Sequence, residues 1–236
     1  MEDSRIKVAE VAELAESFAG MVESAAQAAI TARGRFSLVI PGGSAAEQLL
    51  PRLGTARVEW TRTHIFYSDE RFVPRGDSAS SASASMRLLF TALGTRGPHV
   101  HPMVETANDA ELEAQRYTTK LTDILGPEPA PDLALLGIGE DGHVASLFPG
   151  RPSLEVSESR VVVERSSPKP PPLRLTLSLP LLARARTLVV AAFGSGKAEP
   201  LRAVMRDPAC ALPAARLWRA APHIQWLLDA EAGAAL

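Results

Sequence analysis

The stretch Leu135–Gly150, LLGIGEDGHVASLFPG, begins with apolar residues typical of a buried strand and ends in a glycine-containing loop. Its glycines allow the backbone to turn sharply where the strand ends. Asp141 and His143 lie two residues apart among these glycines. A neutral imidazole held by a carboxylate can accept a proton from water near neutral pH. A lone loop histidine is more often structural, but the neighbouring acids and glycines favour a general base at the end of a strand.

Strands and helices alternate on both sides of this stretch. Short apolar, β-rich runs predict strands at 36–40, 64–69, 99–103, 132–138, 160–164 and 187–193. Amphipathic segments predict helices at 8–30, 45–53, 83–93, 109–125 and 197–205. This alternation predicts an α/β fold with a mostly parallel sheet and helices on both faces, where ligands bind at the carboxyl ends of strands. No internal repeat or linker is visible, so we expect a single domain over residues 1–236.

The composition indicates a globular protein without a strong net charge. Of 236 residues, 46% are hydrophobic, which is ample for a sizeable core. The 27 acidic and 25 basic residues nearly cancel, so we expect no binding to nucleic acid or to an anionic membrane. No apolar run approaches the ~18 residues of a membrane span, and the first ten residues lack a signal-peptide pattern. The single cysteine, Cys210, suits a reducing compartment, and we expect a cytoplasmic protein without an obligatory protein partner.

Three further polar clusters follow predicted strands. In PGGSAA, Pro41–Ala46, glycines would let backbone N–H groups approach an anion closely, although an ordinary tight turn explains them equally well. SDERFVP, Ser68–Pro74, places charged side chains at a strand end, where a solvated charge cluster is the simpler alternative. Arg174 follows a proline-rich run that could be a stiff spacer, and Lys197 opens a helix just past a strand. A guanidinium and an ammonium together would suit a phosphate.

Several other chemistries lack their sequence signatures. The chain has no G-x-S-x-G nucleophile elbow, no H-E-x-x-H zinc motif and no C-x-x-C pair. His99 and His101 lie on one side of a strand, but the sequence offers no third ligand nearby, so we expect no metal site. The PGGSAA segment is neither a Walker loop nor a dinucleotide fingerprint, and we expect no cofactor.

In order and spacing, the segments DERFVP, GIGEDGHVASLFPG, PKPPPLRLTLSLP and GSGK resemble the motifs of the 6-phosphogluconolactonase family. The likeness runs from the first predicted strand to QWLLD near the carboxyl end. It implies a modified doubly wound sheet shared with glucosamine-6-phosphate deaminase. It also implies metal-independent hydrolysis of a sugar phosphate lactone, 6-phospho-D-glucono-1,5-lactone, to 6-phospho-D-gluconate. That reaction is the second step of the oxidative pentose phosphate pathway.

The resemblance further implies a role for each matching residue. His143 would be the general base that activates water, with Asp141 beside it, and Arg71 and Asp69 would lie at the reacting end. The residues around the phosphate would be Gly42, Gly43, Ser44, Arg174 and Lys197. Because a δ-lactone is an activated ester, a base for water and a positive group near the developing oxyanion suffice without a covalent intermediate.

The chain departs from the family pattern at two places, and two rival functions stay open. Ala45 and Ala46 stand where the family usually has Thr-Pro, and a serine- and alanine-rich tract replaces the Ser-Asn pair expected after DER. The rivals are an isomerase or deaminase for amino sugar phosphates and a non-catalytic sugar-phosphate sensor. The deaminase pattern resembles this chain but has a glutamate five residues after the histidine, where Phe148 stands here. A pure sensor would have no use for the pair of Asp141 and His143.

Overall fold

The computed structural model describes residues 3–93 and 97–236 of the chain. Its larger sheet has seven parallel strands in the order β1-β10-β9-β6-β2-β3-β5. These strands are β1 (Ile6–Val8), β2 (Phe36–Ile40), β3 (Thr63–Tyr67), β5 (His99–Val100), β6 (Leu133–Gly137), β9 (Thr187–Ala192) and β10 (Gln225–Leu228). All five residues of β2 are buried, as expected of a strand with helices on both faces.

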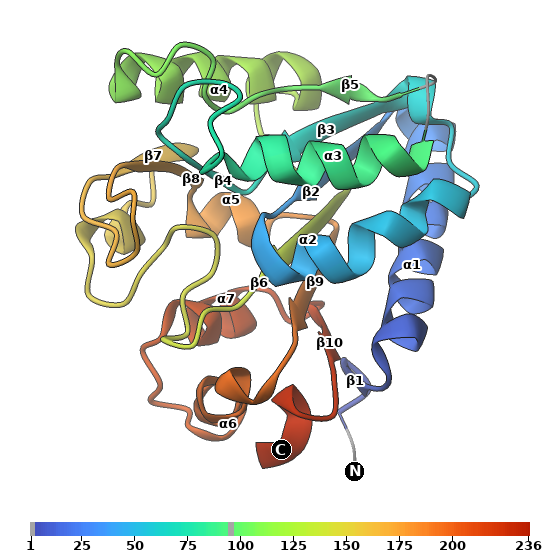
Figure 1. The fold of residues 1–236 in the computed structure, drawn as a ribbon, viewed down its shortest axis with the longest axis vertical. Helices are drawn as coiled ribbons and strands as arrows, with labels where there is room; N and C mark the ends of the chain where they lie inside the picture. Colours follow the sequence, from blue (N-terminus) through green and yellow to red (C-terminus); the bar gives the residue numbers. More distant parts are fainter. Residues whose placement is uncertain (1–2, 94–96) are drawn as a thin grey trace.

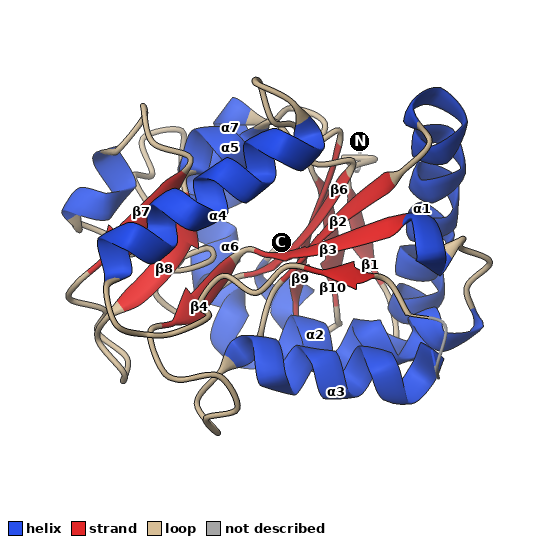
Figure 2. Ribbon diagram, turned by 90° about the horizontal axis from the view of Figure 1, so that it is seen from above, coloured by secondary structure: helices blue, strands red, loops and turns tan. Residues whose placement is uncertain are grey.

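Helices cover the parallel sheet on both sides (Figure 1). The helices are α1 (Val11–Arg33), α2 (Gly43–Leu49), α3 (Ser81–Leu93), α4 (Ala110–Leu125), α5 (Leu179–Ala183), α6 (Ala198–Arg206) and α7 (Pro213–Ala220). Figure 2 shows α2 and α3 on one side of the sheet and α4, α5 and α7 on the other. The expected α/β fold with a mostly parallel sheet and helices on both faces is therefore confirmed.

A second, three-stranded antiparallel sheet lies beside the first, with strand order β4-β8-β7. It consists of β4 (Asp69–Arg71), β7 (Val161–Glu164) and β8 (Arg174–Leu177). Helix α4 packs against β7. Because β4 follows β3 after a single residue, this small sheet begins at the carboxyl edge of the large one.

The strand order places a topological switch point between β2 and β6. From β2 the chain proceeds outward through β3 to β5, whereas from β6 it proceeds the other way through β9 to β10. Crevices at such points, outside the carboxyl ends of the strands, are where open α/β sheets bind ligands. The loops that follow β9, β6, β2 and β3, four adjacent strands, all begin at this edge.

Several predicted elements differ from the observed ones for local reasons. The helix predicted at 45–53 is α2, which begins at Gly43 and gives way to a 3-10 helix at Leu50–Thr55, because Pro51 cannot donate the next α-helical hydrogen bond. The strand predicted at 64–69 is divided at Ser68 into β3 and β4. The strand predicted at 160–164 belongs to the antiparallel sheet. No helix in the described part of the chain is long and apolar enough to cross a membrane.

Candidate active site

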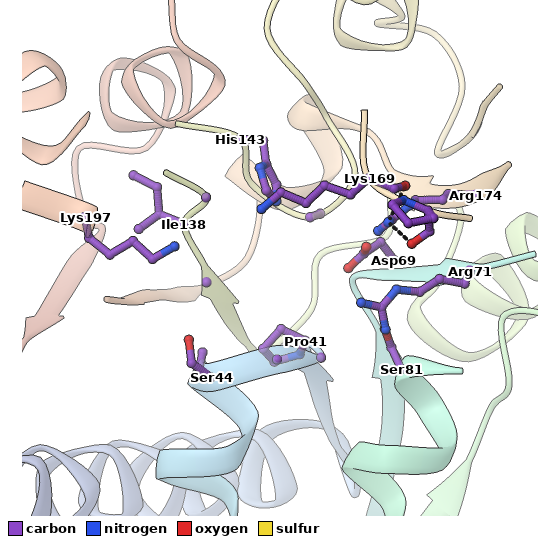
Figure 3. Close-up of a pocket in the computed structure, with 17 residues that line it drawn as sticks. Pro41, Ser44, Asp69, Arg71, Ser81, Ile138, His143, Lys169, Arg174 and Lys197 are labelled. Atoms are coloured by element: carbon purple, nitrogen blue, oxygen red, sulfur yellow. Dashed lines mark hydrogen bonds between the residues drawn. The ribbon is translucent and has the colours of Figure 1, made fainter. Parts of the chain in front are cut away.

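A cavity of about 320 Å³ opens at the carboxyl edge of β9, β6, β2 and β3. Eight of the nine predicted site residues line it, namely Gly42, Gly43, Ser44, Asp69, Arg71, His143, Arg174 and Lys197. The ninth, Asp141, contacts His143. Figure 3 shows these side chains converging from opposite walls, with Lys197 and Ser44 on one side and Asp69 and Arg71 on the other. The structure thus brings together residues that are up to 155 positions apart in the sequence, from Gly42 to Lys197 (197 minus 42).

The pair of Asp141 and His143 is formed in the structure. The distance from Asp141 Oδ1 to His143 Nδ1 is 2.5 Å, and the side chain of His143 is 17% exposed. Burial alone would raise the pKa of Asp141, but the hydrogen bonds and charge of His143 outweigh it and lower that pKa to about 2. Since the carboxylate holds Nδ1, the Nε2 atom is the ring nitrogen that can accept a proton from water.

Gly139 makes room for this pair. A Cβ atom at position 139 would overlap both the His143 ring and the Asp141 carboxylate, so only glycine fits there. On another side of the imidazole lies the ring of Phe148, whose centroid is 4.6 Å from that of His143. Phe148 is 1% exposed, so it fixes the position of the imidazole by packing.

Asp69 connects β4 to the loop that carries His143. Its carboxylate accepts hydrogen bonds from Ser68 Oγ at 2.9 Å and from Ser146 Oγ at 2.6 Å. Ser146 lies three residues after His143, in the same loop. A buried carboxylate and a buried hydroxyl therefore join β4 to the loop that carries His143.

Arg174 holds the proline-rich loop at the cavity wall. Its Nη2 donates to the carbonyl oxygens of Lys169, at 3.0 Å, and Pro170, at 3.3 Å, while its Nε donates to Pro171 O at 3.2 Å. The residue is 5% exposed, and this burial lowers the pKa of the guanidinium. Arg174 lines the cavity, but most of its donors are directed to loop carbonyls.

Lys169 is a cavity residue that the sequence interpretation missed. It lies within PKPPP and lines the cavity together with Lys197 (Figure 3). Burial lowers the pKa of Lys197; the carboxylates of Glu140 and Asp141 oppose this shift, and the charge of Lys169 adds to it. Two ammonium groups in one cavity favour an anionic ligand, because its charge relieves their mutual repulsion.

A second cluster of titratable groups lies away from the cavity, on β3 and at the edge strand β5. His64 of β3 joins His99 and His101, with His64 Nδ1 at 3.0 Å from His101 Nε2. Burial and the neighbouring His64, Lys120 and His99 lower the pKa of His101 to about 4. Within the described residues no group of three or more His, Cys, Asp or Glu side chains is arranged to hold a metal ion.

Comparison with known proteins identifies the family of the chain. Residues 9–226 match the family described as glucosamine-6-phosphate isomerases/6-phosphogluconolactonase. The chain is 36% identical over 220 residues to a 6-phosphogluconolactonase from Mycobacterium tuberculosis, with 89% of this chain and 88% of that protein covered. It is 36% identical to the 6-phosphogluconolactonase of Rattus norvegicus, with 95% and 90% covered.

The solved structures lead to the same conclusion. The 6-phosphogluconolactonase of Trypanosoma brucei superimposes with a TM-score of 0.83 at 26% identity, covering 99% of both chains. A match of this extent spans nearly the whole of both chains, so the two proteins share the fold. The chain belongs to the glucosamine-6-phosphate isomerase/6-phosphogluconolactonase family.

Proposed function

We propose that the protein hydrolyses 6-phospho-D-glucono-1,5-lactone to 6-phospho-D-gluconate, the lactonase step of the oxidative pentose phosphate pathway. One observation carries the proposal: a carboxylate-held imidazole lies in the same small cavity as two arginines and two lysines. A base that activates water, a cation for an oxyanion and cations for a phosphate are the groups this reaction needs. The relatives named 6-phosphogluconolactonase support the same substrate.

In the proposed mechanism His143 Nε2 takes a proton from a water molecule while the water oxygen attacks C1 of the lactone. The carbonyl π electrons move to the exocyclic oxygen, and Arg71 stabilises the resulting oxyanion. When the tetrahedral intermediate collapses, the bond between C1 and the ring oxygen breaks. The imidazolium then returns its proton to the ring oxygen, which becomes the free hydroxyl of the product. Asp141 stabilises the imidazolium between these two proton transfers.

The phosphate is assigned to the wall that carries Ser44 and Lys197, together with the ammonium of Lys169, which extends into the cavity from the proline-rich loop (Figure 3). Phosphate binding by Gly42, Gly43 and Arg174 stays a prediction of the sequence. Because Arg174 Nη2 donates to the carbonyl oxygens of Lys169 and Pro170, Arg174 is better suited to holding Lys169 in place.

The test is the rate of acid release from freshly prepared 6-phosphogluconolactone, corrected for spontaneous hydrolysis. The unphosphorylated gluconolactone, assayed in parallel, should be a poor substrate. Lys197→Ala should raise KM by roughly 10- to 150-fold with little change in kcat, since a charge-assisted bond worth about 1.5–3 kcal/mol persists from ground state to transition state. Lys120→Ala, on α4 and outside the cavity, serves as the control with the same change of charge.

No acceleration over the spontaneous rate would overturn the proposed function. Equal kcat/KM values for the two lactones would instead be consistent with lactone hydrolysis but would show that the protein does not recognise the phosphate.

A further inference from the structure

Strand β4 presents two of its three side chains to the cavity and the third to the protein interior. Asp69 and Arg71 line the cavity, whereas Glu70 between them does not, as the alternation of side chains along a strand requires. Glu70 is 2% exposed and has no part in the proposed hydrolysis. A buried carboxylate is costly unless it is fully hydrogen-bonded, so its contacts should show what it does.

Glu70 fastens the first turn of α3 to β4. Its Oε1 accepts hydrogen bonds from the backbone N–H groups of Arg71 and Ser81, each at 2.7 Å. Its Oε2 accepts from Ala82 N at 2.7 Å and from Ser80 Oγ at 2.9 Å. The carboxylate therefore acts as an N-terminal cap supplied from a different element, where a negative charge is favourable. Burial raises the pKa of Glu70, and these four donors oppose the shift.

Ser81, held in this way, contacts the side chain of Arg71. Arg71 Nη1 donates to Ser81 Oγ at 2.5 Å and to Ala79 O at 3.2 Å. The buried Nε of Arg71 has no hydrogen-bond partner among residues 3–93 and 97–236. The orientation of the guanidinium thus depends on the short segment that leads into α3 (Figure 3).

Ser81 is also fixed from the opposite direction. A Cβ atom at Gly42 would lie 2.7 Å from Ser81 Oγ, so the loop after β2 packs directly on this hydroxyl. The serine is 3% exposed. With the loop on one side and the Glu70 cap on the other, its Oγ has little freedom to leave Arg71.

We propose that Ser81, fixed by the Glu70 cap, is a positioning residue that orients the Arg71 guanidinium toward the reacting end of the cavity. The proposal rests on the proposed function, in which Arg71 stabilises the oxyanion. In this proposal the serine-rich tract after DER positions Arg71.

A double-mutant cycle tests this inference in the full chain with 6-phosphogluconolactone. Ser81→Ala should lower kcat about 10-fold or more and change KM little, because misplacing the arginine weakens only the transition state. Arg71→Ala should lower kcat further, by about 10²-fold or more. In the Arg71→Ala background, Ser81→Ala should then cost less than about 2-fold, since the group it positions is absent.

Two further variants distinguish the loss of Arg71 positioning from a general disturbance of helix α3. Ser81→Thr retains the hydroxyl and should restore most of kcat. Ser83→Ala makes the same change two residues along the same helix, where no side-chain hydrogen bond is formed within the described residues, and should leave kcat unchanged. An equal loss from Ser81→Ala with and without Arg71, or a loss confined to KM, would overturn the inference and make Ser81 a direct substrate ligand.

A measurement without substrate distinguishes failure of this inference from failure of the proposed function. NMR relaxation of the Arg71 Nε–H group should report an ordered guanidinium in the wild-type protein and increased picosecond-to-nanosecond motion in Ser81→Ala. If the Arg71 Nε–H group is equally ordered in Ser81→Ala and in the wild-type protein, Ser81 does not position Arg71, whatever the rate of lactone hydrolysis by the wild-type protein. If the wild-type protein is inactive but Ser81→Ala shows the expected loss of order at Arg71, only the proposed lactonase function is refuted.

Discussion

At the scale of single residues, His143 is the group on which turnover should depend most. Asp141 holds its Nδ1, Phe148 packs against its ring, and its side chain faces the cavity. His143→Ala should leave the fold intact and lower kcat by about 10²- to 10⁴-fold, the usual contribution of a general base. His223→Ala, a histidine outside the cavity, is the matched control. Near-normal turnover in folded His143→Ala would exclude this histidine as the base.

The dependence of kcat on pH follows from the same pair. The pKa of Asp141 is lowered to about 2, so its carboxylate stays ionised between pH 5 and pH 8. We expect kcat to fall as the pH is lowered and the His143 imidazole is protonated, because an imidazolium cannot accept a proton. Asp141→Asn should lower kcat, since the side chain no longer offers a carboxylate to hold Nδ1 and stabilise the imidazolium. A kcat that is flat from pH 5 to 8, after correction for spontaneous hydrolysis, would argue for another base.

The sequence predicted most of these side chains because they lie in polar clusters that follow predicted strands, where glycines and charges interrupt an apolar run. Lys169 was missed because the surrounding prolines are also typical of a stiff spacer. Ser81 was missed because it belongs to a low-complexity tract, and its contact with Arg71 exists only once α3 has packed against β4. Contacts of this kind depend on tertiary structure, which no local pattern contains.

At the scale of elements, the sequence predicted those with strong periodicity and missed those that tertiary pairing creates. The strand at 36–40 and the helix at 109–125 agree with β2 and α4, the latter capped by Asp109. Strand β4 consists of three charged residues, and β8 follows a proline run, so neither resembles an isolated strand. They are strands because they pair with each other, with Asp69 opposite Thr176 and Arg71 opposite Arg174.

The edge strand β5 offers a prediction about stability. His101 lies just beyond it, where burial and the nearby His64, Lys120 and His99 disfavour its protonation. Because the pKa of His101 falls to about 4 in the folded state, the unfolded chain binds more protons between about pH 6.5 and pH 4. The free energy of unfolding should therefore decrease as pH falls through this window, by on the order of 1–2 kcal/mol after allowance for screening.

Urea denaturation at a series of pH values measures this effect. His101→Gln should flatten the decrease in unfolding free energy between about pH 6.5 and pH 4, because the titrating ring is removed. His223→Gln, outside the cluster, should leave the slope as it is in the wild-type protein. If His101→Gln and wild type show the same slope, the histidine cluster does not govern acid stability.

At the scale of the whole molecule, the fold places polar loops from four adjacent strands at one edge and closes the cavity with a second sheet. The mostly parallel arrangement could be predicted from the alternation of strands and helices, and the site from the clusters at the strand ends. The antiparallel sheet could not be predicted from the sequence, although it places Asp69, Arg71 and Arg174 in the cavity wall. The arrangement concentrates cations around one base, which suits the hydrolysis of an anionic lactone.

The same arrangement should exclude the other reaction of this family. Isomerisation and deamination of an amino sugar phosphate require ring opening and proton transfer between two carbons, which need more acid-base groups than one histidine supplies. The position five residues after His143 is occupied by Phe148, which is 1% exposed, packs on the imidazole and can neither donate nor accept a proton. We expect no conversion of glucosamine 6-phosphate to fructose 6-phosphate and ammonia. Coupled detection of ammonia, on a preparation whose lactonase rate has been verified, measures this directly. Ammonia released well above a no-enzyme control, and lost in His143→Ala, would show that the cavity performs the deaminase reaction without a glutamate at that position.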